Sequence, residues 1–263
     1  MAWRSDLAYS YDGSFDGLMT CVFESYASKE IPIDIQSGDE QQYLLFPTKW
    51  VETDLEKAER VYRAIGSKVS SEAQRFVREG FLTCAEQKEV LILRFLRLGF
   101  THGKAVMDML ADDTVHLLQR AVQRLNHESH MFTGFVRFSV YDDVLVSVIE
   151  PKNEVLPILS DHFCERYRNE AFLIYDKTHK KALVHQPPVG SHKAGLTDIL
   201  EVDEFVLPEP GEEEKAYRRL WKQFYDTVAI KERISPRRQM SHMPKRYWAN
   251  LTEMSQNEVK RLR

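Results

Sequence analysis

The chain has 263 residues, of which 43% are hydrophobic, and its formal net charge is −4. This composition is typical of a folded globular protein and excludes a largely disordered chain. No apolar run approaches the roughly 20 residues that cross a bilayer, and the N-terminus lacks a secretory signal, so we expect a cytoplasmic protein without a membrane anchor. The three cysteines lie far apart in the sequence, which is typical of a reducing compartment.

The first part of the chain predicts a strand, a turn and a helix in succession. Residues 7–11 alternate like a short strand, Asp12 and Gly13 supply a turn, and Ser14 is placed to cap a helix over 14–29. A second strand is expected within 41–50, ending at Pro47. A helical section then follows over 53–130, with its helices at 54–66, 70–80, 86–100 and from Asp113 to about His127.

The pattern changes after residue 130. Residues 134–151 predict two strands around a Tyr-Asp-Asp turn, residues 154–167 a helix, and residues 172–186 a second hairpin. This order favours an α+β fold with a small, largely antiparallel sheet (β-β-α-β-β), a helical middle section and a docked C-terminal helix.

The end of the chain differs from the rest in composition and charge. We expect residues 1–190 to form an α+β body, and residues 191–263 to hold a linker, an amphipathic helix and a basic C-terminal segment packed on that body. Residues 215–263 carry 13 Lys or Arg against 4 Asp or Glu, a balance of +9, whereas the preceding residues have a balance of −13. The helix has an apolar stripe that predicts docking on the body, made of Tyr217, Leu220, Trp221, Phe224 and Val228.

A first candidate site is the turn between the first strand and helix. Asp12 and Asp16 flank it, and a carboxylate in such a place can face a metal ion or a ribose hydroxyl. Two acids at a helix start repel phosphate, and the P-loop lysine is missing, so the turn is not a phosphate cradle. The alternative is structural: Asp12-Gly13 makes the turn and Asp16 favours the helix dipole.

A second candidate site lies in the predicted sheet region. Arg137 interrupts an apolar strand pattern and needs an acidic partner, for which Glu150 and Asp161 are candidates. One reading is a polar pocket with general acid/base groups, and the other is an ion-pair network that fixes the strand register. A His–Glu–His metal site is not predicted, because the spacing matches no established motif. The candidate catalytic residues are Asp12, His130, Arg137, Glu150, His162 and Arg166.

A third candidate site is the basic C-terminal segment. Arginine and lysine make most phosphate contacts, aromatic rings stack on exposed bases, and the prolines favour an extended segment. In the alternative, Tyr247 and Trp248 anchor the end of the chain in the core, and the basic groups are simply solvated. The candidate nucleic-acid-binding residues are Lys231, Arg233, Arg237, Arg238, His242, Lys245, Arg246, Tyr247 and Trp248.

Five motifs, in order along nearly the whole chain, resemble a bacterial family of DNA metabolism or repair proteins that is classed as a domain of unknown function. They are YDGSFDGLMTCVFESY, HMFTGFVRFS, IEPKNEVLPILSDHFCERY, IYDKTHKKALVH and MPKRYWANLTEM. Members of the family are typically encoded beside a radical-SAM protein. Some carry a fused domain similar to uracil-DNA glycosylase, which is not expected here because the chain ends soon after MPKRYW. The resemblance implies a context in DNA repair and a radical-SAM partner, but it implies no reaction and no catalytic residues.

Three hypotheses of function stay open. The leading one is an accessory protein of DNA repair that binds DNA through its basic segment and acts with the radical-SAM partner. The second is a hydrolase that processes a nucleotide or base in a pocket of Asp12, His130, Glu150 and His162. The third is an interaction scaffold that does not bind nucleic acid. The sequence does not identify a cofactor.

Overall fold

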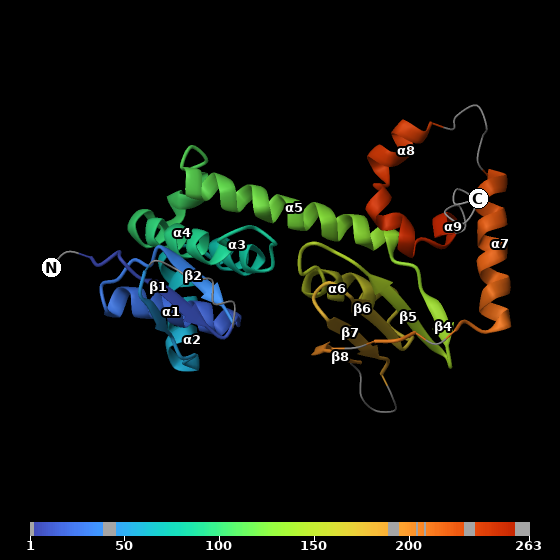
Figure 1. The fold of residues 1–263 in the computed structure, drawn as a ribbon, viewed down its shortest axis with the longest axis horizontal. Helices are drawn as coiled ribbons and strands as arrows, with labels where there is room; N and C mark the ends of the chain where they lie inside the picture. Colours follow the sequence, from blue (N-terminus) through green and yellow to red (C-terminus); the bar gives the residue numbers. More distant parts are fainter. Residues whose placement is uncertain are drawn as a thin grey trace. The chain divides into compact units, whose positions relative to one another are not determined.

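A computed structural model describes residues 3–38, 46–188, 195–203, 205–207, 209–228 and 235–255 (Figure 1). The contacts divide the chain into two compact units, Met1–Asn126 and His127–Arg263. The boundary expected from the sequence, at residue 190, lies inside the second unit. Within the described ranges, no helix has the length and apolar character needed to span a membrane.

The first unit contains a three-stranded parallel sheet. Strand β1 (Ala8–Tyr11) lies in the middle, between β2 (Asp34–Ser37) and β3 (Thr48–Trp50). Helix α1 (Phe15–Ala27) forms the crossover from β1 to β2 that a parallel pair requires. Strand β2 was not predicted, since its sequence DIQS is mostly polar. Most of the strand expected within 41–50 lies outside the described residues, and β3 begins only after Pro47.

Helices make up the rest of the first unit, as the sequence predicts. They are α2 (Leu55–Lys68), α3 (Ser71–Phe81), α4 (Lys88–His102), the 3-10 helix η1 (Gly103–Asp108) and α5 (Asp113–Phe135), which continues into the second unit. Helix α4 is apolar on nearly every side and fully buries Ile92, Leu93, Phe95 and Leu96. Burial on all sides explains why its sequence has so weak an amphipathic pattern.

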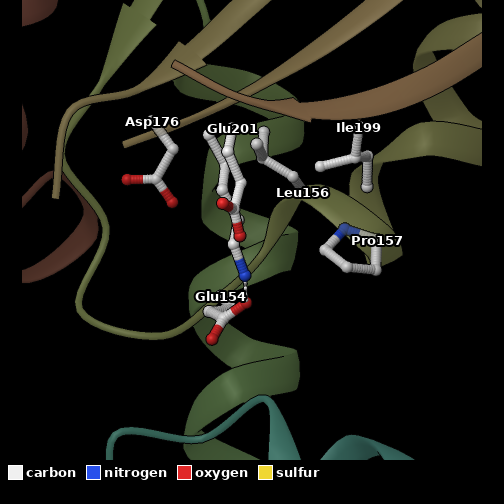
Figure 2. A pocket seen from close by; sticks show the side chains of 7 residues that line it. Glu154, Leu156, Pro157, Asp176, Ile199 and Glu201 are labelled. Carbon is white, nitrogen blue, oxygen red and sulfur yellow. Dashed lines mark hydrogen bonds and ion pairs between the residues drawn. The ribbon is translucent and has the colours of Figure 1, made fainter. Parts of the chain in front are cut away.

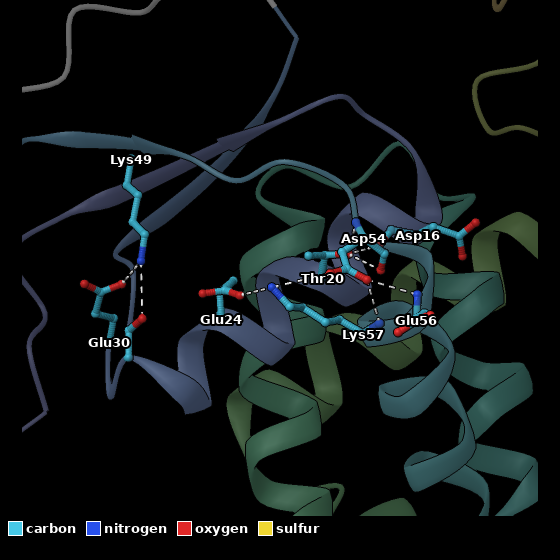
Figure 3. Close-up of polar contacts among 9 residues, drawn as sticks. Asp16, Thr20, Glu24, Glu30, Lys49, Asp54, Glu56 and Lys57 are labelled. Carbon is cyan, nitrogen blue, oxygen red and sulfur yellow. Dashed lines mark hydrogen bonds and ion pairs between the residues drawn. The ribbon is translucent and has the colours of Figure 1, made fainter.

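A polar cluster fixes the start of α2 against α1 (Figure 3). The Thr20 hydroxyl donates to the backbone carbonyl of Asp16 at 2.8 Å and accepts from the backbone N–H of Asp54 at 3.2 Å. Asp54 caps α2, and its side chain accepts from the backbone N–H of Lys57. The Lys57 ammonium also pairs with Glu24 of α1 at 2.9 Å. Buried Thr20 therefore links α1 to the backbone of the residue that caps α2.

The second unit contains a five-stranded sheet with the order β4-β5-β6-β7-β8 (Figure 1). The α+β class is confirmed, but the sheet is mixed, because β5 pairs with β6 in parallel and the other pairs are antiparallel. Helix α6 (Leu156–Arg166) connects β5 to β6, and such a crossover makes the two strands parallel. Strand β8 was not predicted. The strands are β4 (Ser139–Tyr141), β5 (Val144–Ile149), β6 (Phe172–Asp176), β7 (Lys181–Gln186) and β8 (Leu196–Glu201).

The turn between β4 and β5 is the predicted Tyr-Asp-Asp turn. Asp142 and Asp143 both have positive φ angles, 46° and 65°. Two successive residues with positive φ are typical of the tight hairpin turn that matches the twist of the strands, and aspartate tolerates this conformation better than most residues. The local sequence therefore fixes the register of this hairpin.

The basic C-terminal segment is helical, and the extended conformation expected from its prolines is wrong. It forms α8 (Pro236–His242), the 3-10 helix η3 (Lys245–Asn250) and α9 (Thr252–Ser255). Pro236 occupies the first turn of α8, where its missing N–H needs no partner, and Ser235 caps the helix. Pro244 directly precedes η3. The prolines therefore begin helices here and do not prevent them.

Helix α7 (Glu212–Val228) does not bury its apolar stripe, contrary to the docking that the sequence predicts. Its described part has no buried residue. Polar groups hold the helix to the rest of the unit: the Arg218 guanidinium donates to the Ser139 hydroxyl at 2.6 Å, and the Trp221 indole N–H donates to Glu253 of α9 at 3.1 Å. The five stripe residues remain 42% to 61% exposed. An amphipathic pattern shows that one face of a helix is apolar, but it does not show what covers that face.

Candidate nucleic-acid interface

Tyr247 anchors the C-terminal segment in the second unit. It is 4% exposed, and its ring packs on Phe132 and Phe135 of α5 with centroid separations of 5.1 and 5.0 Å. The Trp248 indole N–H donates to the carbonyl of Met243 at 2.9 Å, which ties η3 to the end of α8. These two aromatic residues hold the segment in place, so they are not free platforms for bases.

Arg246 also has a structural partner. It forms an ion pair with Glu128 of α5 at 3.0 Å, and Glu128 is only 2% exposed. The same carboxylate accepts hydrogen bonds from the backbone N–H groups of Lys152 and Asn153 and from the Asn153 side chain. Because a buried carboxylate needs such partners, Arg246 is held in the fold and is a poor candidate for phosphate contact.

The remaining basic groups of the segment face solvent. Arg237, Arg238 and His242 of α8 and Lys245 of η3 are exposed. Among the described residues, no carboxylate pairs with any of these four side chains, while the Lys245 ammonium lies 6.0 Å from the centre of the Trp248 ring. Lys231 and Arg233 lie outside the described residues. The segment thus has an anchored side and a side with spare positive charge.

A groove with a volume of about 980 Å³ lies within the second unit, between the end of α5, helix α6 and helix α7. One wall is formed by Phe138, Phe163 and Tyr167. The ring of Phe138 lies edge to face with the rings of Phe163 and Tyr167, with centroid separations of 5.7 and 5.1 Å. The other wall is formed by four residues of the apolar stripe of α7: Tyr217, Leu220, Trp221 and Phe224. The polar lining residues are Thr133, Arg137, His162, Arg166, Glu214, Arg218 and Thr252.

Arg137 lies in this groove and pairs with Glu253, so the predicted partnership with Glu150 or Asp161 is wrong. The guanidinium contacts both Glu253 oxygens, at 2.8 and 3.3 Å, and donates to the carbonyl of Gly134 at 2.7 Å. Burial alone would raise the pKa of Glu253, but hydrogen bonds from Arg137 and Trp221 outweigh it and hold the pKa below its ordinary value. Glu253 of α9 is 2% exposed. Its carboxylate contacts Arg137, which lies between α5 and β4, and Trp221 of α7, so it joins these three parts of the unit.

His162 and Arg166 also line the groove. They lie one turn apart on α6, both are exposed, and the Arg166 guanidinium is 5.8 Å from the centre of the Tyr167 ring. Glu214 is the one carboxylate among the lining residues, and it pairs with Arg218 at 2.8 Å. The described lining therefore keeps positive charge that no carboxylate of its own neutralises.

The other candidate catalytic residues do not join this groove. His130 is an exposed residue of α5, and exposed Glu150 pairs with Lys177 at 3.1 Å. Asp12 belongs to the first unit, where it accepts from the hydroxyls of Ser14 and Thr53, both at 2.7 Å. Burial would raise the pKa of Asp12, but these hydrogen bonds together lower it. Asp12 thus joins the end of β1 to the loop before α2. In the described ranges, no three His, Cys, Asp or Glu side chains form a group that could hold a metal ion.

A smaller pocket of about 210 Å³ lies beside the first residues of α6 (Figure 2). The carboxylates of Glu154, Asp176 and Glu201 line it. Two of them already have partners within the protein: Glu154 pairs with Lys181 at 2.6 Å, and buried Asp176 accepts from His179 at 2.6 Å. Asp176 also accepts from the backbone N–H groups of Thr178 and His179 in the turn between β6 and β7. These contacts give Asp176 a structural role, because they stabilise the turn of the β6–β7 hairpin.

Comparisons with known proteins add a family and little else. No curated protein matches the chain in sequence. A solved structure, the pGpG-specific phosphodiesterase PggH from Vibrio cholerae, aligns with 84% of this chain and 99% of its own, at 9% identity and a TM-score of 0.32. A score this low supports no inference about fold or activity. The sequence profile described as "Domain of unknown function (DUF4130)" matches residues 86–253, which is more than half of the chain. The chain therefore belongs to the DUF4130 family.

Proposed function

We propose that this protein binds nucleic acid through the exposed basic side of its C-terminal segment, as an accessory of DNA metabolism or repair that acts with a radical-SAM partner. The supporting observation is the pair Arg237 and Arg238, with Lys245 beside them. These side chains are exposed and have no carboxylate partner among the described residues, on helices that Tyr247 anchors. Spare cations on an anchored surface are what a phosphate backbone requires.

Ion pairs within the fold neutralise only part of the positive charge of the C-terminal segment. One basic group of the segment is paired with a buried carboxylate of α5, Arg246 with Glu128. If the acidic part of the chain had attracted the whole basic segment, α8 would show similar pairs. The described part of α8 shows none, which favours an external polyanion over internal charge balance.

The partnership rests on the family resemblance. Radical-SAM chemistry is assigned to the partner, and this chain would hold the nucleic acid on which that chemistry acts. The competing view is a scaffold whose basic side docks on the partner enzyme directly. The two views differ in whether purified protein binds DNA in the absence of any partner.

The test is binding to single- and double-stranded DNA as a function of salt. Each cation that neutralises a phosphate contributes about 0.7 to 0.9 to the slope of log K against log salt. We expect the double variant Arg237→Gln/Arg238→Gln to bind more weakly and to lose roughly 1.5 from this slope. The matched control is Lys177→Gln/Lys180→Gln, which removes the same charge from exposed side chains of the same unit.

Two results would contradict the proposal. One is an absence of DNA binding by the wild-type protein at low salt. The other is an equal loss of slope in the α8 variant and in the control, which would indicate a general charge effect. Co-purification with the partner that survives nuclease treatment, together with no DNA affinity, would support the scaffold.

A further inference from the structure

Three aromatic rings of α7 stand exposed in a row along the groove. Tyr217 is 61% exposed, Trp221 42% and Phe224 58%, and all three line the groove. Large aromatic side chains that remain exposed side by side usually mark a binding surface. Elsewhere in the described chain Trp50 is also 59% exposed, but rings such as Tyr9, Tyr11, Phe95 and Phe172 are completely buried.

We propose that this groove binds unpaired nucleotides, with their bases stacked on the rings of α7 and a phosphate near Arg166. The inference rests on the proposed nucleic-acid binding and names the form of nucleic acid and the residues that select it. Under this proposal, the basic side of α8 holds the backbone, and the groove holds bases.

The spacing of the rings suits successive bases. Residues 217, 221 and 224 recur at helical spacing on one side of α7, and seven residues of helix extend about 10 Å. A stacked strand advances about 3.4 Å per nucleotide, so this stripe has room for roughly three bases. The rings of Trp221 and Phe224 are already close to parallel, with their centroids 5.8 Å apart and an interplanar angle of 29°. These two rings therefore stack on each other, and both line the groove.

The charge of the groove favours a polyanion over an apolar protein segment. Its lining carboxylate Glu214 is paired with Arg218, and the Arg137 guanidinium is neutralised by Glu253. Arg166 also lines the groove, and among the described residues no carboxylate forms an ion pair with it. A surface that combines ring faces with a spare guanidinium matches the requirements of single-stranded nucleic acid.

Helix α8 also contacts α7, the helix that forms one wall of the groove. The Gln239 side chain, which directly follows Arg238, donates to the hydroxyl of Tyr225, which directly follows Phe224 of the groove. Under the proposal, a strand bound along α8 continues toward α7 and into the groove. Duplex DNA keeps its bases inside the stack, so only unpaired or extruded bases can reach the rings of α7.

The experiment measures binding by fluorescence anisotropy with three labelled probes: an oligothymidylate of about 12 nucleotides, its duplex, and an abasic strand of the same length. We expect the wild-type protein to prefer the oligothymidylate over the other two. The variant Tyr217→Ala/Phe224→Ala should lose roughly tenfold or more in affinity for the oligothymidylate and little for the duplex or the abasic strand. Thermal melting checks that the variant folds.

The matched control is Leu196→Ala. Leu196 lies on β8 of the same unit, is 68% exposed and does not line the groove, so its loss should leave oligothymidylate binding nearly unchanged. Equal affinity of the wild-type protein for all three probes would overturn the inference and leave backbone binding by α8 intact. Unchanged binding in the double variant would also overturn it, in favour of a protein occupant. A wild-type protein that binds no probe would remove both proposals.

Discussion

Helix α7 and the segment 235–255 are both rich in aromatic and basic residues, yet they orient them in opposite ways. The segment buries Tyr247 and exposes the basic side chains of α8. Helix α7 exposes its rings and uses Arg218 and Glu214 to attach itself to the unit. The difference shows that the same composition can form an anchor or a binding surface, depending on which face finds a packing partner.

The partner of Tyr247 is the end of α5. Phe132 and Phe135 place two rings at about 5 Å from it, which removes its aromatic face from water. In the described structure, no comparable cluster of rings covers the stripe of α7. Three variants test this contrast, and they are given from the largest expected effect to the smallest.

Tyr247→Ala should give the largest loss of stability. Truncation of a buried aromatic ring removes its contacts with Phe132 and Phe135 and leaves a cavity, which costs about 3–5 kcal/mol. Urea denaturation followed by tryptophan fluorescence measures this loss. Tyr247→Phe is the control, because it keeps the ring and removes only the hydroxyl that contacts Arg246. A loss below about 1 kcal/mol for Tyr247→Ala would show that the segment is not anchored through this residue.

Arg137→Ala should have the next largest effect, about 2–3 kcal/mol, because it leaves the Glu253 carboxylate buried without its cation. The variant should also change the pH dependence. The pKa of Glu253 in the folded protein lies below its ordinary value of 4.5, so its ion pair stabilises the protein above that pH and is lost as the pH falls through the lowered value.

The measurement is the free energy of unfolding at several pH values. The wild-type protein should lose stability below about pH 4.5, and Arg137→Ala should lose less over the same range because its carboxyl group no longer gains from ionisation. Glu150→Gln is the control, because it also removes one member of an ion pair, but both Glu150 and its partner Lys177 are exposed. Parallel pH curves for the wild type and Arg137→Ala would contradict the assignment.

Phe224→Ala should change stability least, by less than about 0.5 kcal/mol, although it removes a ring from an amphipathic helix. The ring is 58% exposed, so its removal forfeits little buried area. Thermal denaturation under the same conditions as for Tyr247→Ala gives the comparison directly. A loss similar to that of Tyr247→Ala would mean that the stripe of α7 packs on the unit and is not a binding surface.

Local sequence patterns were sufficient for most of the secondary structure. Periodicity predicted the helices α2 to α5, and Asp142 and Asp143 predicted the first hairpin turn. The polar strand β2 gave no periodic signal. The parallel pair β5–β6 was missed, although the helix between the two strands already implied a crossover. Strand direction thus followed from the order of the elements more than from the strand sequences themselves.

The site was less accessible to sequence analysis, because its decisive contacts join distant residues. The partner of Arg137 is 116 positions away at Glu253, and that of Arg246 is Glu128. No local pattern identifies such partners. From the sequence, an arginine paired with a buried carboxylate could not be distinguished from one that is exposed and has no carboxylate partner. The rings of α7 were recognised as an apolar stripe, but their exposure depends on elements elsewhere in the unit. The signal that could have identified them was the number of arginines and lysines beside the stripe.

Trp221 connects the groove to the buried ion pair. Its ring lines the groove, while its indole N–H donates to the same Glu253 carboxylate that holds Arg137. A ligand that stacks on this ring only in the folded state will stabilise the second unit by mass action, by about 2.7 kcal/mol at a concentration 100 times its dissociation constant. Occupancy of the groove and resistance to unfolding of the second unit are therefore thermodynamically linked.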